Sequence, residues 1–100
     1  MAAAFASVYD GEVDLIGMDL SLEMLLQAKK NLLHKNVTAQ MVHGDVTLLP
    51  FADASFDIVL VAHVLEHMAN PEPALAELCR ALRPGGVLLA CVTRPSSVGA

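Results

Sequence analysis

Residues 56–67 read FDIVLVAHVLEH, and this stretch decides the fold class. Its middle part, from Ile58 to Ala62, is apolar, rich in β-branched side chains and free of polar alternation. Strands that are buried on both faces have this composition, as in parallel sheets covered by helices. The stretch therefore predicts a buried strand of a mostly parallel sheet.

The end of the same stretch, HVLEH at 63–67, has the H-x-x-E-H spacing of one class of zinc peptidases. Such a site needs a helix that places both histidines on one face, and a third ligand from elsewhere. Here the motif follows a strand directly, and Asn70-Pro71 ends any helix within about two turns. We therefore predict no metal. His63 and His67 are then either an ordinary loop and helix pair or residues that face a ligand at the strand end.

Short apolar runs alternate with helical periodicity on both sides of this stretch. Strands are expected at residues 13–18, 39–42, 58–62 and 87–93, and helices after Ser21 and after Asn70. In the second helix, a leucine stripe at 75, 78 and 82 is expected to be buried. The alanine-rich residues 1–9 are compatible with the tail of a helix that breaks at Asp10-Gly11. The order of elements predicts an α/β fold.

Composition limits the functional classes. One hundred residues make one small domain, and 55% apolar against 17% charged residues argue against disorder. A net charge of −5 offers no basic patch for nucleic acid. The longest apolar run is far shorter than the ~20 residues of a membrane span. Cys79 and Cys91 are expected to be buried thiols, and the protein is expected to be cytoplasmic.

Two carboxylates stand at strand ends. Asp19 and Asp45 each follow an apolar strand, so both should lie at one edge of the sheet, with His63 at the end of a third strand. A carboxylate in such a place accepts hydrogen bonds from a ribose diol in nucleotide-binding folds, although turn-forming aspartates are also common there. No G-x-G occurs, and counting about 20 residues back from Asp19 reaches Met1. The pattern favours a nucleoside ligand.

Two segments, IGMDLSLEML at 16–25 and HGDVTLLPFADASFDIVLVAHVLEHMANPEPALAELCRALRPGGVLLA at 43–90, resemble class I S-adenosylmethionine-dependent methyltransferases. The similarity is to the small-molecule type that includes the ubiquinone and menaquinone biosynthesis enzymes, and it covers roughly residues 12–94. It implies a Rossmann-like, mostly parallel sheet with flanking helices, in which residues 1–100 form one partial domain that is truncated at both ends. The family's strands 2 to 5 are expected, whereas its central strand 1, its glycine-rich loop and its C-terminal strands are not.

The resemblance also implies roles for single residues. Asp19 would accept hydrogen bonds from the ribose hydroxyls of S-adenosylmethionine, and Leu20 would pack on the adenine. Asp45, after Gly44, would accept from the adenine amino group, while the backbone N–H of Val46 would meet a ring nitrogen. His63 would lie beside the methionine part of the cofactor. HVLEH then lines the cofactor and acceptor pocket.

These roles imply methyl transfer to a small-molecule acceptor. His63, His67 and Glu66 are open alternatives for a proton acceptor, and no catalytic residue is assigned. The alternative function is a non-catalytic remnant that binds a ligand or serves as an oligomerisation module, with a second copy or a partner subunit completing the sheet. A nicotinamide-dependent dehydrogenase shares the acidic residue after strand two but gives no reason for Asp45 in its GDVTLLPF setting.

Overall fold

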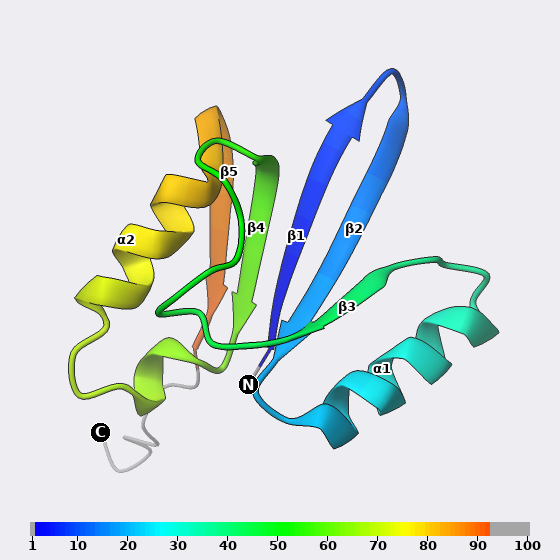
Figure 1. Cartoon of the computed structure of the whole chain (residues 1–100), viewed down its shortest axis with the longest axis horizontal. Helices are drawn as coiled ribbons and strands as arrows, with labels where there is room; N and C mark the ends of the chain where they lie inside the picture. The colour runs from blue at the N-terminus through cyan, green and yellow to red at the C-terminus, as the bar shows by residue number, and fades with distance from the viewer. Residues whose placement is uncertain (1, 93–100) are drawn as a thin grey trace, which may run out of the picture.

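A computed structural model describes residues 2–92 as a five-stranded sheet with two α-helices (Figure 1). Along the chain the elements are β1 (Ala2–Tyr9), β2 (Glu12–Asp19), α1 (Leu22–His34), β3 (Gln40–His43), β4 (Phe56–Ala62), a 3-10 turn (Leu65–His67), α2 (Glu72–Ala81) and β5 (Leu82–Cys91). Each predicted strand and helix is present, and its bounds differ from the expected ones by at most five residues. Thr93, the expected end of the last strand, lies outside the described residues.

The strand order is β3-β2-β1-β4-β5, with β3 parallel to β2 and β5 parallel to β4. β1 lies at the centre and is antiparallel to both of its neighbours. The other four strands therefore share one direction, and their carboxyl ends meet at one edge, the lower edge in Figure 1. The predicted α/β class is confirmed, in a mixed sheet in which four of the five strands share one direction.

The prediction of a helical tail at residues 1–9 is wrong, and the centre of the sheet is occupied. Asp10 and Gly11 form a two-residue hairpin turn with φ of +48° and +79°, which brings Tyr9 opposite Glu12. Two positive φ angles in succession give the turn whose twist matches that of paired strands. Alanine is the strongest helix former, but intrinsic propensity is small compared with tertiary context, and the ladders on both sides of β1 outweigh it. The central place is thus filled by a strand of reversed direction.

One face of the sheet carries the main core and is covered by α2 and by the segment between β3 and β4. Phe5 of β1 is fully buried, and its ring lies 5.0 Å from that of Phe51 and 5.1 Å from that of Phe56. α2 contributes Leu78 together with Ala74 and Ala81. The expected leucine stripe is thus only partly confirmed, because the leucines at 75 and 82 are half-buried and the fully buried residues of α2 are Ala74, Leu78 and Ala81.

The opposite face of the sheet is covered only in part. α1 begins at the predicted cap, where Ser21 Oγ accepts a hydrogen bond from the Met24 N–H at 3.3 Å, and it packs over β2 and β3. Ile58 and Leu60 of β4 point to this face and remain 39% and 36% exposed, whereas Val59 and Val61 are buried. The expectation that this strand is buried on both faces is therefore wrong for the described residues.

Other expectations concern single residues and the membrane. Cys79 and Cys91 are exposed rather than buried, because α2 turns Cys79 outward and β5 is an edge strand. Among residues 2–92, no helix is long and apolar enough to cross a membrane. In the same residues, no cluster of three or more metal-ligating side chains occurs.

Candidate functional site

A pocket of about 230 Å³ opens at the edge where β2, β3 and β4 end. Five of the six residues predicted to bind a cofactor line it: Asp19, Leu20, Gly44, Asp45 and Val46. The walls are completed by residues from the start of β1, the end of β2, the turn after β3 and the segment after β4, namely Ala3, Met18, Thr47, Val64, His67 and Met68. The structure therefore brings together residues that are up to 65 positions apart in the sequence, counting from Ala3 to Met68.

Asp19 is the buried acid of the pocket. It is only 6% exposed, and its Oδ1 accepts a hydrogen bond from the Ser21 N–H at 2.9 Å. This bond fixes the carboxylate against the start of α1, while the β2 backbone holds its Cα in the sheet. A buried charged group of this kind must be hydrogen-bonded to remain stable. Asp19 is thus held in one orientation at the pocket wall.

Asp45 is the second, more exposed acid. Its Oδ1 accepts from the Thr47 N–H at 2.9 Å, and its carbonyl oxygen accepts from the Leu48 N–H at 3.1 Å. Two bonds close residues 45–48 into a tight turn in which the side chain caps its own backbone. Asp19 at the end of β2 and Asp45 in this turn therefore line one pocket.

The end of β3 holds the backbone around Asp19. The Gly44 N–H donates to the Asp19 carbonyl at 3.1 Å, and His43 Nε2 lies 2.7 Å from the Leu20 carbonyl oxygen. Because that carbonyl can only accept, Nε2 carries the proton in this contact. The residue type at 43 gave no signal in the sequence, since its role depends on a contact 23 residues away.

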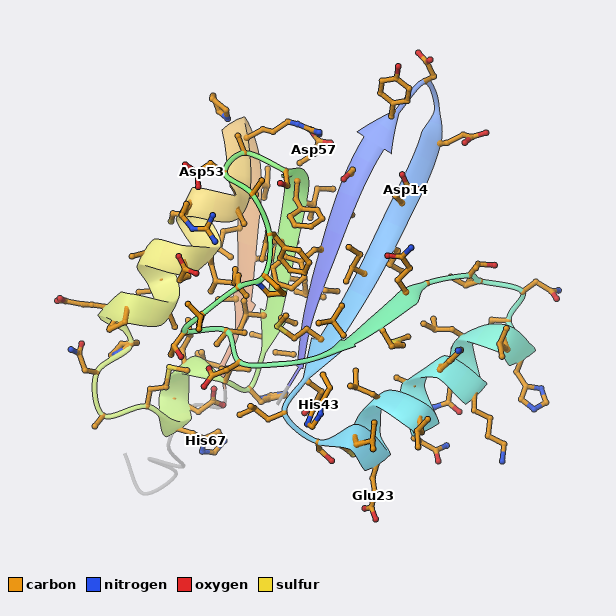
Figure 2. All side chains as sticks on the ribbon, in the orientation of Figure 1. Asp14, Glu23, His43, Asp53, Asp57 and His67 are labelled. Atoms are coloured by element: carbon orange, nitrogen blue, oxygen red, sulfur yellow. The ribbon has the colours of Figure 1, made fainter. Side chains whose placement is uncertain are left out.

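His63 is placed differently from the other predicted residues. It adopts a left-handed backbone with φ of +56°, its Nδ1 lies 3.3 Å from Oε2 of Glu66, and it is not among the residues that line the pocket. His67, one 3-10 turn further on, does line it. Figure 2 shows His67 and His43 at the same end of the sheet, from the segment after β4 and from β3. The HVLEH motif therefore reaches the pocket through Val64 and His67.

Charge distinguishes between ligand classes. Two carboxylates line the pocket, and none of the described lysines or arginines does. A phosphate or pyrophosphate group would meet repulsion there, whereas hydroxyl and amino donors or a cation would be attracted. The arrangement suits a nucleoside without phosphates.

The central strand meets the pocket with its amino-terminal end. Ala3 lines the pocket, and Ala2 is paired with both Asp19 and Ala62. The turn after β1 therefore lies at the opposite edge, at Asp10 and Gly11. Within residues 2–92, no glycine-rich turn from a central strand faces this pocket, which is built from the β2, β3 and β4 ends together with Ala3 at the start of β1.

Comparison with known proteins agrees with this geometry. A model of the methyltransferase domain family matches residues 1–90. This chain belongs to that family. The demethylmenaquinone methyltransferase of Renibacterium salmoninarum is 39% identical over 80 residues, which are 80% of this chain and 32% of that protein. The ubiquinone/menaquinone biosynthesis C-methyltransferase of Laribacter hongkongensis is 40% identical over 79 residues, 79% of this chain and 32% of that protein.

A solved structure shares the architecture as well. The YcgJ protein of Bacillus subtilis is 32% identical, with a TM-score of 0.69 over 75% of this chain and 32% of that one. The resemblance to class I S-adenosylmethionine-dependent methyltransferases is thereby confirmed. The chain spans about one third of the length of these curated relatives.

Proposed function

We propose that residues 1–100 form one partial domain that binds the nucleoside part of S-adenosylmethionine, within a methyltransferase that acts on a small molecule. The observation that carries the proposal is the pair Asp19 and Asp45 lining one pocket without a lysine or arginine among the described residues. Family membership and the methyltransferase names of the relatives support it.

The residues present fit this cofactor by the chemistry of their donor set. Asp19 supplies acceptor oxygens for ribose hydroxyls, Asp45 for the adenine amino group, the Val46 N–H for a ring nitrogen, and half-exposed Leu20 an apolar surface for the base. When bound, the cofactor supplies an electrophilic methyl group on a cationic sulfonium. The negative charge of the two acids favours that cation over the pyrophosphate of a dinucleotide.

His67 is our candidate for a group that takes a proton from the methyl acceptor. It lines the pocket, whereas His63 and Glu66 contact one another beside it. Imidazole is the side chain that most often transfers protons in enzymes, and its unprotonated ring nitrogen can accept one. Enzymes that work by alignment need such a base only for some acceptors, so His67 would matter most for oxygen or nitrogen acceptors. The place of His63 beside the methionine part stays a prediction.

The alternative, a ligand-binding or oligomerisation module without catalysis, is suggested by the open sheet face. Leu60, Val87 and Leu89 are 36%, 49% and 51% exposed, and they lie side by side on β4 and β5. Contiguous apolar patches of this kind are usually covered in a working protein. A second copy or a partner subunit would cover this patch. The cytoplasmic location of the protein also stays a prediction.

Titration of the chain with S-adenosylhomocysteine, followed by amide chemical shifts, tests the proposal. Two hydrogen bonds to charged acceptors contribute on the order of 1.5–3 kcal/mol each, which matches weak binding with a Kd of about 1 mM. Asp19→Ala should abolish the shifts. Asp14→Ala, on the same strand at the opposite edge (Figure 2), should leave them unchanged. Equal binding by wild type and Asp19→Ala would refute the ribose assignment.

A further inference from the structure

One ion pair outside the pocket is connected to its wall. Arg80 and Glu77, both on α2, lie one helical turn apart, with Nε of Arg80 2.7 Å from Oε2 of Glu77. Neither side chain lines the pocket. Both contact the segment between β3 and β4, whose first four residues, Gly44, Asp45, Val46 and Thr47, line the pocket. The pair therefore joins α2 to the part of the chain that forms one side of the site.

The backbone of Leu49 is held on both sides by this pair. Its N–H donates to Oε1 of Glu77 at 2.8 Å, and its carbonyl accepts from an Arg80 Nη at 3.3 Å. Leu49 follows directly on the turn that Asp45 closes with the N–H groups of Thr47 and Leu48. The side chain of Leu49 is also buried in the core. The position of Leu49 thus fixes the end of the turn formed by residues 45–48.

Arg80 extends the connection further along the same segment. One Nη donates to the Phe51 carbonyl at 2.8 Å and to Oδ1 of Asp53 at 2.7 Å. The contact with Glu77 lowers the pKa of that carboxyl and raises the pKa of the Arg80 guanidinium, because each stabilises the charged form of the other. A planar guanidinium can bind several acceptors at fixed angles, which a lysine cannot do. Figure 2 shows Asp53 beside α2, far from His67 at the pocket end.

We propose that Arg80 and Glu77 are positioning residues for the cofactor site, which act by fixing the wall that carries Asp45, Val46 and Thr47. This inference rests on the proposed function, because the wall matters to a ligand only if that pocket binds one. Loops without such ties open locally at low free-energy cost. A ligand then binds only the fraction of molecules with the wall in place, and its apparent affinity falls by that fraction.

Two variants with a matched control test the proposal. Arg80→Met removes the contacts with Glu77, Leu49, Phe51 and Asp53 while keeping an apolar stem. Arg83→Met removes an ion pair of similar length, 2.8 Å to Asp57, at the opposite end of the sheet. Arg80→Lys keeps the charge but not the planar fork. Hydrogen exchange of the Leu49 amide and titration with S-adenosylhomocysteine are measured on all three chains and on the wild type.

We expect Leu49 exchange to speed up about tenfold or more in Arg80→Met and its affinity to fall roughly tenfold, with Arg80→Lys between it and the wild type. Arg83→Met should change neither. Unchanged Leu49 exchange in Arg80→Met, or faster exchange with full affinity, would overturn the positioning role. If the wild type itself shows no binding, the proposed function fails and the positioning role with it, while faster exchange would still show the tie between α2 and the segment.

Discussion

The backbone N–H of Val8, near the end of β1, donates to Oδ2 of Asp57 on β4 at 2.7 Å. The same oxygen accepts from Arg83 of β5 at 2.8 Å. The last cross-strand pair between β1 and β4 is Ala6 with Ile58, so the side chain of Asp57 continues the connection beyond the ladder. Asp57 thus joins three strands at the edge opposite the pocket and supports the reversed direction of β1.

Replacing Asp57 by alanine should therefore release the end of β1. Loss of a charged acceptor at a partly exposed position should lower the free energy of unfolding by about 1–2 kcal/mol. Urea denaturation measures that change, and hydrogen exchange should accelerate at Val8 more than at Phe5. Asp57→Asn keeps an acceptor oxygen and should recover part of the loss. Equal exchange at Val8 in all three chains would show that this bond does not hold β1.

The reversed direction of β1 can be tested directly. Facing residues of antiparallel strands bring their α-protons close at alternate pairs, whereas parallel strands do not. Nuclear Overhauser contacts between α-protons of β1 and β4 are therefore expected along the register that pairs Ala4 with Leu60 and Phe5 with Val59. Contacts in which the residue numbers of β1 and β4 rise together, instead of one rising as the other falls, would mean that β1 is parallel to β4 and would contradict this topology.

The sequence predicted most elements because their signals are local. Ser21 is a recognisable N-cap and predicts the start of α1, and the apolar runs before Asp19 and Asp45 predict the ends of two strands. β1 was not predicted, since alanine-rich residues favour helix and the deciding ladders are formed with the strands that flank β1. The Asp10-Gly11 turn was the available signal. Arg80 and Glu77 could not be predicted, because their contacts with Leu49 span 31 and 28 residues and depend on the packing of α2.

Two neighbouring glycines of β5, Gly85 and Gly86, lie where its register with β4 shifts, and they should respond differently to alanine. At Gly86 an added Cβ would lie 2.9 Å from the Arg83 carbonyl oxygen and 3.0 Å from that of Asp57, so backbone must move. At Gly85, with φ of +83°, it would meet nothing within 4 Å, and only the left-handed backbone opposes it. We expect a cost of about 1–2 kcal/mol for Gly85→Ala and more for Gly86→Ala. Urea midpoints that rank the two variants in reverse order would contradict this.

We expect the purified chain to carry no stoichiometric zinc. His63 contacts Glu66, whereas His67 lines the pocket, and the 3-10 turn between them is a single three-residue turn. A closed tetrahedral site needs four converging ligands. Elemental analysis after dialysis should give well under one zinc per chain, in the wild type and in His63→Ala alike. About one zinc per chain that disappears in His63→Ala would restore the metal interpretation of HVLEH.

Acid should lower the free energy of unfolding in part by protonating Glu77. Its pKa lies below the ordinary value of 4.5, first because Arg80 donates a hydrogen bond to it and second because the Leu49 N–H does. A carboxyl whose pKa is lower in the folded state stabilises the fold fully above 4.5, and this contribution is lost as the pH falls through the folded-state pKa. The urea midpoint of the wild type should therefore drop between about pH 4.5 and pH 3 more than that of Glu77→Gln, which lacks the titrating group. Glu12→Gln, an exposed glutamate at the start of β2, controls for the loss of one carboxylate and should follow the wild type. Parallel curves for the wild type and Glu77→Gln would mean that the contacts with Arg80 and Leu49 do not favour the ionised form, and that they do not hold the wall of the pocket.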